Sequence, residues 1–130
     1  MNSGIPVLVV DDDKSIQGLV EETLIEDGFL PTIVSSGEEA INLLAANKYY
    51  VMILDISLGP DRIKGWPIAR RARAVSPDMP VIYITGGPRH DWAVEGVPNS
   101  VLLAKPFAPA QLVTAVLQLL NRTNFGGLAV

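Results

Sequence analysis

The sequence of 130 residues has no cysteine and a single histidine, His90. Without cysteine, disulfide bonds and metal sites built from thiolates are excluded. There is no run of about 18 apolar residues, the length that a membrane-spanning helix requires. The N-terminus, "MNSGIPVLVV", has no basic segment before its apolar residues, as a secretory signal would. We therefore expect a cytoplasmic protein that does not enter a membrane.

Basic residues are also scarce. Ten lysines and arginines stand against 14 acidic residues, which gives a net charge of −4. Nucleic-acid backbones require a basic face, so nucleic acid is not expected as a partner. Three arginines cluster at 70, 71 and 73, and their spacing indicates the solvated face of a helix.

Short apolar runs without alternation are the clearest pattern present. Hydrophobic residues make up 48% of the chain and charged residues 18%, as in a globular domain. Continuous runs favour strands that are buried on both faces of a parallel sheet. Four such runs are "IPVLVV" (5–10), "YVMIL" (50–54), "VIYIT" (81–85) and "VLLA" (101–104), and the half-polar "LPTIVS" (30–35) predicts an edge strand.

Helical patterns separate these runs. An apolar stripe over residues 16–24 ends before Gly28, a residue typical of helix C-termini. Ser36 and Glu39 have the spacing of a capping box, and residues 66–75 and 112–120 predict two further helices. The glycines and prolines of segment 86–98 leave room for one short helix at most. Strand and helix thus alternate five times, which predicts an α/β sandwich with right-handed crossovers.

Polar residues collect where the predicted strands end. In open parallel sheets, ligands bind beyond the carboxyl ends of the strands. The first strand ends in three aspartates, the third in one, the fourth in a threonine followed by two glycines, and the fifth in a lysine. These residues are Asp11, Asp12, Asp13, Asp55, Thr85, Gly86, Gly87 and Lys105.

Neighbouring carboxylates repel one another, so a positive charge is expected among them. Carboxylates without histidine or cysteine suit a hard cation, above all Mg²⁺, which usually accompanies phosphate. Lys105 and Thr85 would donate to phosphoryl oxygens, and a carboxylate could attack phosphorus to form an aspartyl phosphate. A single aspartate at a strand end could equally be a helix N-cap. Four strands that deliver such groups to one edge favour a site.

In the order and spacing of these motifs, the chain resembles the receiver domain of two-component response regulators. The resemblance runs from Val7 to about Leu120 and rests on the acidic pair, "LD", "IT" and "KPF". It implies a flavodoxin-like fold with a five-stranded parallel sheet of order 2-1-3-4-5 and helices on both faces. Residues 1–122 would form the receiver and 123–130 a short tail. Because the sequence stops soon after the last helix, we expect a stand-alone regulator.

The resemblance also implies a Mg²⁺ site. Asp12 would be a direct ligand, Asp11 would act partly through water, and Asp55 and the backbone carbonyl of Ser57 would complete the site. Asp13 lies outside the motif, so we interpret it as a helix N-cap.

The same resemblance makes Asp55 the phosphoacceptor. Thr85 would be the switch hydroxyl that receives the phosphoryl group, and Lys105 would pair with its oxygens. The Lys105–Pro106 peptide bond is typically cis in this family.

Three features depart from the family pattern. Leu102 stands three residues before Lys105, where an aromatic switch residue is usual. The loop 56–64 is about two residues longer than the common pattern before Gly65, and the segment around the fourth helix is short and rich in proline.

The expected function is a signalling switch. The domain would take a phosphoryl group from a histidine kinase or a histidine phosphotransfer protein and signal to a downstream protein. It would not be an enzyme beyond accepting and slowly releasing the group. Leu102 keeps open a pseudo-receiver that acts without phosphate. Asp11, Asp13 and Ser15 also have the spacing of haloacid-dehalogenase-type phosphatases, but no later acidic pair follows Lys105.

The last predicted helix carries two apolar residues outside its core stripe, Val113 and Leu117. At 100° per residue they lie on one flank of the helix. We expect them to join Leu102 in an apolar output patch that binds a partner or a second copy of the chain.

Overall fold

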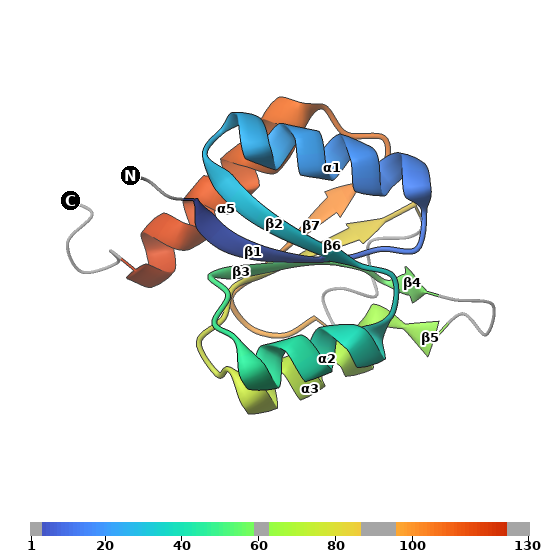
Figure 1. The fold of residues 1–130 in the computed structure, drawn as a ribbon, viewed down its shortest axis with the longest axis vertical. Helices are drawn as coiled ribbons and strands as arrows, with labels where there is room; N and C mark the ends of the chain where they lie inside the picture. The colour runs from blue at the N-terminus through green and yellow to red at the C-terminus, as the bar shows by residue number, and fades with distance from the viewer. Residues whose placement is uncertain (1–3, 59–62, 87–95, 125–130) are drawn as a thin grey trace.

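The computed structural model describes residues 4–58, 63–86 and 96–124. Five parallel strands form its central sheet (Figure 1). Their order is β2-β1-β3-β6-β7, which is the predicted order 2-1-3-4-5 counted over the five long strands. The strands are β1 (Ile5–Val10), β2 (Phe29–Val34), β3 (Val51–Asp55), β6 (Val81–Thr85) and β7 (Ser100–Ala104).

Helices cover both faces of the sheet. Helices α1 (Lys14–Glu26) and α5 (Pro109–Asn124) lie on one face, and α2 (Gly37–Ala46) and α3 (Gly65–Val75) lie on the other (Figure 1). Successive strand residues point to opposite faces. Val7 and Val9 therefore pack with α1 and α5, whereas Leu8 and Val10 pack with α2 and α3. The flavodoxin-like fold predicted from the sequence is confirmed.

Local signals explain where the helices begin and end. Asp13 is the N-cap of α1, and its carboxylate accepts from the amides of Ser15 (2.8 Å) and Ile16 (3.3 Å), as predicted. Gly28, just beyond the C-cap, has φ +87°, a left-handed conformation that glycine adopts without a Cβ clash. The Ser36 hydroxyl caps α2 by accepting from the amide of Glu39 at 3.2 Å.

The sequence analysis did not find the second, two-stranded sheet. Strands β4 (Ser57–Leu58) and β5 (Ile63–Lys64) pair antiparallel within the longer loop after β3 (Figure 1). Two residues are too few to show a period in the sequence, so no pattern could reveal them. The short helix expected within 86–98, together with His90, lies largely outside the described residues, as do tail residues 125–130. No helix in the described ranges is long and apolar enough to cross a bilayer.

Candidate functional site

The carboxyl edge of the sheet brings the predicted polar residues together. Val10 pairs with Leu54 in the register of β1 and β3, so the next residues along, Asp11 and Asp55, follow side by side. Asp55 pairs with Ile84, one residue before Thr85. The Lys105 amide donates to the Thr85 carbonyl at 2.8 Å, which places both residues at this edge.

Three carboxylates form a tight cluster there. Asp11, Asp12 and Asp55 each offer an oxygen, and these oxygens lie within 4.8 Å of one another. Asp11 and Asp55 are buried, with exposed fractions of 1% and 5%, while Asp12 is exposed. Asp11 Oδ1 accepts from the Asp13 amide at 2.9 Å, but its buried Oδ2 has no hydrogen-bond partner among the described residues. A buried oxygen without a donor, beside two more carboxylates, fits a hard cation such as Mg²⁺.

The electrostatics of Asp11 follow from this position. Burial raises the pKa of its carboxyl group to about 6, against the hydrogen bond from Asp13, which lowers the pKa. The charge of Asp55 raises the pKa further, and the Lys105 ammonium opposes that increase. A protonated Asp11 can donate its hydrogen to Asp55, whereas an ionised Asp11 needs a cation instead. Without a cation, the Asp11 carboxyl group therefore keeps its proton up to a higher pH than an exposed aspartate does.

Lys105 faces the buried acceptor candidate. Its Nζ lies 3.4 Å from Oδ2 of Asp55, and its side chain is 26% exposed. Thr85 is buried, with an exposed fraction of 4%, and the Lys105–Pro106 bond is cis, as expected. Ser57, the fourth predicted member of the metal site, is in strand β4, two residues beyond Asp55.

Gly65 lets the start of α3 approach this edge. Its amide donates to the Ile56 carbonyl at 2.8 Å. A Cβ at Gly65 would lie 3.0 Å from the Asp55 carbonyl oxygen and 2.9 Å from the Ile56 Cα. The contact fixes the backbone that carries Asp55.

The predicted output patch of Leu102, Val113 and Leu117 stays a prediction. Leu102 pairs with Tyr83 and packs against the core cluster under α2 and α3. The core residues of α5 belong to the cluster on the opposite face. Leu117 is 52% exposed beside Ile5 at the start of β1, and Val113 is half-buried.

The sequence analysis also missed Gln17 of α1. Its side-chain amide donates to the backbone carbonyl of Asp11 at 2.5 Å and to the Ser35 hydroxyl at 3.1 Å. Only a polar residue one turn after the Asp13 cap could have signalled it, and such residues are common on solvated helix faces.

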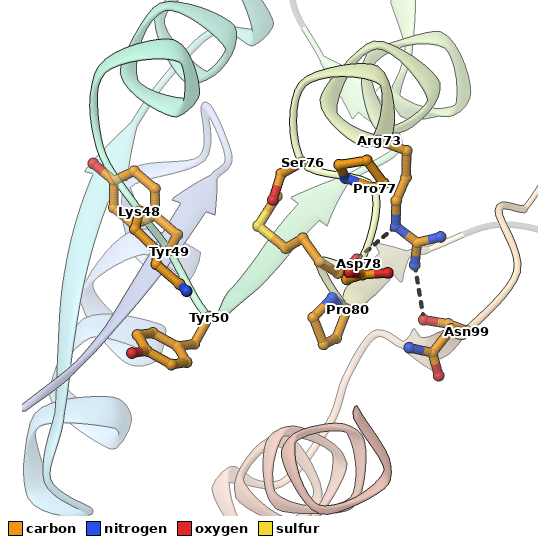
Figure 2. Close-up of a pocket in the computed structure, with 10 residues that line it drawn as sticks. Lys48, Tyr49, Tyr50, Arg73, Ser76, Pro77, Asp78, Pro80 and Asn99 are labelled. Atoms are coloured by element: carbon orange, nitrogen blue, oxygen red, sulfur yellow. Dashed lines mark hydrogen bonds between the residues drawn. The ribbon is translucent and has the colours of Figure 1, made fainter. Parts of the chain in front are cut away.

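A hollow of about 610 Å³ lies at the other end of the strands (Figure 2). Arg73 in its wall donates from Nε to the Met79 carbonyl (2.6 Å) and from Nη2 to the Asn99 carbonyl (3.1 Å). These bonds join the end of α3 to the segments before β6 and β7. None of the clustered carboxylates lines this hollow, and the side chain of Arg73 there links backbone segments to one another.

The fold and the edge define a flavodoxin-like α/β protein with an acidic site at the carboxyl ends of its strands. The family model for the response regulator receiver domain matches residues 7–117, and the chain belongs to this family. The family membership predicted from the sequence is confirmed.

Similar proteins agree. A response regulator receiver protein from Sinorhizobium medicae WSM419 is 43% identical, with a TM-score of 0.84 over 92% of this chain and 96% of that chain. The receiver domain of sensor histidine kinase PA1611 from Pseudomonas aeruginosa PAO1 is 24% identical, with a TM-score of 0.81 over 92% of this chain and 99% of its own. That protein was solved with a magnesium ion in its active site cleft.

A longer relative is response regulator MprA of Mycobacterium sp. (strain KMS). It is 29% identical over 122 residues, which cover 92% of this chain and 52% of that protein. The chain thus spans about half the length of the curated relatives it matches.

Proposed function

We propose that this receiver domain accepts a phosphoryl group on Asp55 from a phosphohistidine of a histidine kinase or phosphotransfer protein. The observation that carries the proposal is the surroundings of Asp55. It is a buried carboxylate with the Lys105 ammonium at 3.4 Å and two further carboxylates within 4.8 Å. A bare carboxylate cluster would repel an incoming phosphoryl group, so the site requires a cation as well as Lys105.

The cation would be Mg²⁺, held by oxygens of Asp11, Asp12, Asp55 and the Ser57 carbonyl. When bound, it neutralises the carboxylates and stabilises charge on the transferred oxygens. Asp11 suits a ligand better than a nucleophile, because its Oδ1 already accepts from Asp13 and its Oδ2 lacks a donor. Asp12 is exposed, so it would close the site from the solvent side.

The transfer itself would use Asp55 and its neighbours. A carboxylate oxygen of Asp55 attacks phosphorus, the phosphorus–nitrogen bond breaks, and its electron pair returns to the imidazole of the partner. Lys105 is within reach of Asp55 and donates to a phosphoryl oxygen. Thr85, at the end of the next strand, donates its hydroxyl to another. Water later hydrolyses the acyl phosphate, so the domain acts as a switch and catalyses only these two steps.

The readout of this switch would be a changed protein surface that a downstream protein recognises. The movement of Thr85 toward the phosphoryl group would alter the adjoining end of β6. The partner that recognises this surface would be a downstream protein or a second copy of the chain.

Mass spectrometry of the intact protein tests the proposal. With acetyl phosphate and Mg²⁺, the wild type should gain one phosphoryl group, and Asp55→Asn should gain none. Asp78→Asn, in the hollow at the other end of the strands, is the matched control and should label normally. Labelling of Asp55→Asn would move the nucleophile elsewhere, with Asp11 next in line. An unlabelled wild type would support the pseudo-receiver, and rapid multiple turnover would support a phosphatase.

A further inference from the structure

The side chain of Gln17 joins two loops at the acidic edge. Its Nε2 donates to the Asp11 carbonyl oxygen (2.5 Å) in the β1–α1 connection and to the Ser35 hydroxyl (3.1 Å) in the β2–α2 connection. A carbonyl oxygen only accepts, so the atom that touches Asp11 must be the amide nitrogen. One NH₂ group thus serves both partners.

The bond to Asp11 acts on the peptide that links the two clustered aspartates. The carbonyl of Asp11 and the amide of Asp12 lie in one planar peptide unit. A hydrogen bond that fixes the Asp11 carbonyl therefore also orients the Asp12 amide. Asp11 is also held at its amide, which donates to Val34 (3.1 Å), and at Oδ1, which accepts from Asp13 (2.9 Å). Gln17 donates the third hydrogen bond that fixes Asp11, at the carbonyl group that links it to the exposed Asp12.

The second partner of Gln17 is firmly placed. The Ser35 amide donates to the Glu39 carboxylate (3.3 Å), and the neighbouring Ser36 hydroxyl caps α2. The backbone of Ser35 is therefore tied to Glu39 of α2.

Helix α1 itself does not need these bonds. The backbone amide of Gln17 already donates to Asp13 (2.9 Å), and Asp13 caps the first turn. Both acceptors of the Gln17 side chain lie outside the helix, so its contacts serve the edge of the sheet.

We infer that Gln17 is a positioning residue for the Mg²⁺ site, because it fixes the Asp11–Asp12 peptide against Ser35 and so holds both carboxylates ready for the cation. The inference rests on the proposed function. Outer partners that orient metal ligands typically change affinity 10–100-fold when removed. Gln17 acts on backbone rather than on a ligand atom, so the lower end of this range is expected.

The test is a titration of the metal-free protein with Mg²⁺. Calorimetry measures the affinity, and NMR measures the amide chemical shifts. Gln17→Met keeps the length of the side chain and its helix propensity but removes the donor. It should bind Mg²⁺ roughly tenfold more weakly, and the Asp12 amide resonance should shift even before metal is added. Gln118→Met, on the exposed face of α5, is the matched control and should match wild type.

Ser35→Ala separates positioning from general stability, because Ser35 is exposed and lies outside the helices. It should weaken Mg²⁺ binding less than Gln17→Met does, and the double variant should be no weaker than Gln17→Met alone. Such non-additivity is expected of residues that share one interaction. If Gln17→Met is poorly folded, Ser35→Ala alone carries the test.

Wild-type affinity within twofold in both variants, or losses that simply add, would overturn the inference while leaving the proposed function intact. A wild type that takes up no Mg²⁺ would overturn both.

Discussion

The buried carboxyl group of Asp11 is costly to ionise in the metal-free protein. In water its pKa would be near 3.8, and burial raises it to about 6 in the folded state. The folded protein therefore binds this proton more tightly than the unfolded chain. Stability that depends on the proton is fully present below about pH 4 and is lost as the pH rises through 6.

We expect Asp11→Asn to stabilise the metal-free protein at neutral pH. An asparagine keeps an oxygen for the Asp13 amide and has no charge to bury. A difference in pKa of about two units corresponds to about 3 kcal/mol. Urea unfolding with EDTA should show the variant gaining on wild type between pH 4 and pH 7. Adding Mg²⁺ should then stabilise wild type more than the variant. A difference in unfolding free energy that does not change with pH would contradict this account.

The residues of the site differ in how far the sequence could predict them. Asp11, Asp55, Thr85 and Lys105 each stand at the end of an apolar run, and Asp12 follows Asp11, so the strand-end rule places them together. Gln17 follows no such rule, because its role depends on a side chain that crosses to another loop. The predicted patch joined Leu102 to Leu117 because of the angles around the last helix and the family pattern. The face on which Leu102 packs depends on the folded sheet, so the sequence alone could not show it.

Strand β3 and helix α3 meet so closely that there is no room for a side chain at Gly65. A Cβ at Gly65 would lie 2.9 Å from the Ile56 Cα and 3.0 Å from the Asp55 carbonyl oxygen, and these backbone atoms cannot rotate away. Gly18 in α1 is the opposite case, because a Cβ there meets nothing within 4 Å.

Gly65→Ala should destabilise the protein by about 1–3 kcal/mol, the usual cost of inserting a methyl group into a filled space. Its uptake of phosphoryl groups should also slow, since the displaced backbone carries Asp55. Gly18→Ala should instead gain roughly 1 kcal/mol from better helix propensity. Denaturant melts of both variants check the pair, and similar effects from both substitutions would show that the Gly65 contact relaxes freely.

The elements themselves were largely predictable. All five long strands and the four described helices match the apolar patterns, but several starts differ by one to three residues. The elements β2, β3, β7 and α3 begin one residue away from the predicted start, at Phe29, Val51, Ser100 and Gly65, and α5 begins three residues earlier, at Pro109. Caps such as Asp13 and Ser36 have local sequence signals, which is why these boundaries agree. Strands β4 and β5 have none, because each depends only on pairing with the other.

The two ends of the central sheet have different roles in the molecule. The carboxyl edge holds the acidic cluster. At the other end, Arg73 ties α3 to the segments that lead into β6 and β7 (Figure 2). Burial lowers the pKa of the Arg73 guanidinium, yet arginine stays charged at any ordinary pH.

Arg73→Ala should therefore lower stability by about 1.5–3 kcal/mol, as expected for hydrogen bonds from a charged donor. Its Mg²⁺ affinity should not change. Arg71→Ala is the matched control two residues away. It removes only an ion pair with Glu38 whose side chains are 52% and 76% exposed, so it should cost under about 1 kcal/mol. Thermal melts and Mg²⁺ titrations of both variants measure the contrast, and a loss of Mg²⁺ binding in Arg73→Ala would show that the two ends are coupled.

The division of the core by the sheet has a consequence for how such proteins can be recombined. Side chains under α1 and α5 touch a different cluster from those under α2 and α3, and only strand backbone is common to both. Effects of substitutions without shared partners generally add. A hybrid can therefore inherit one helical layer from each of two parents, provided that the strand residues facing each layer travel with it. The acidic residues lie at the ends of the strands, so such hybrids would exchange their outer surfaces and keep one chemistry, provided that α1 keeps Gln17.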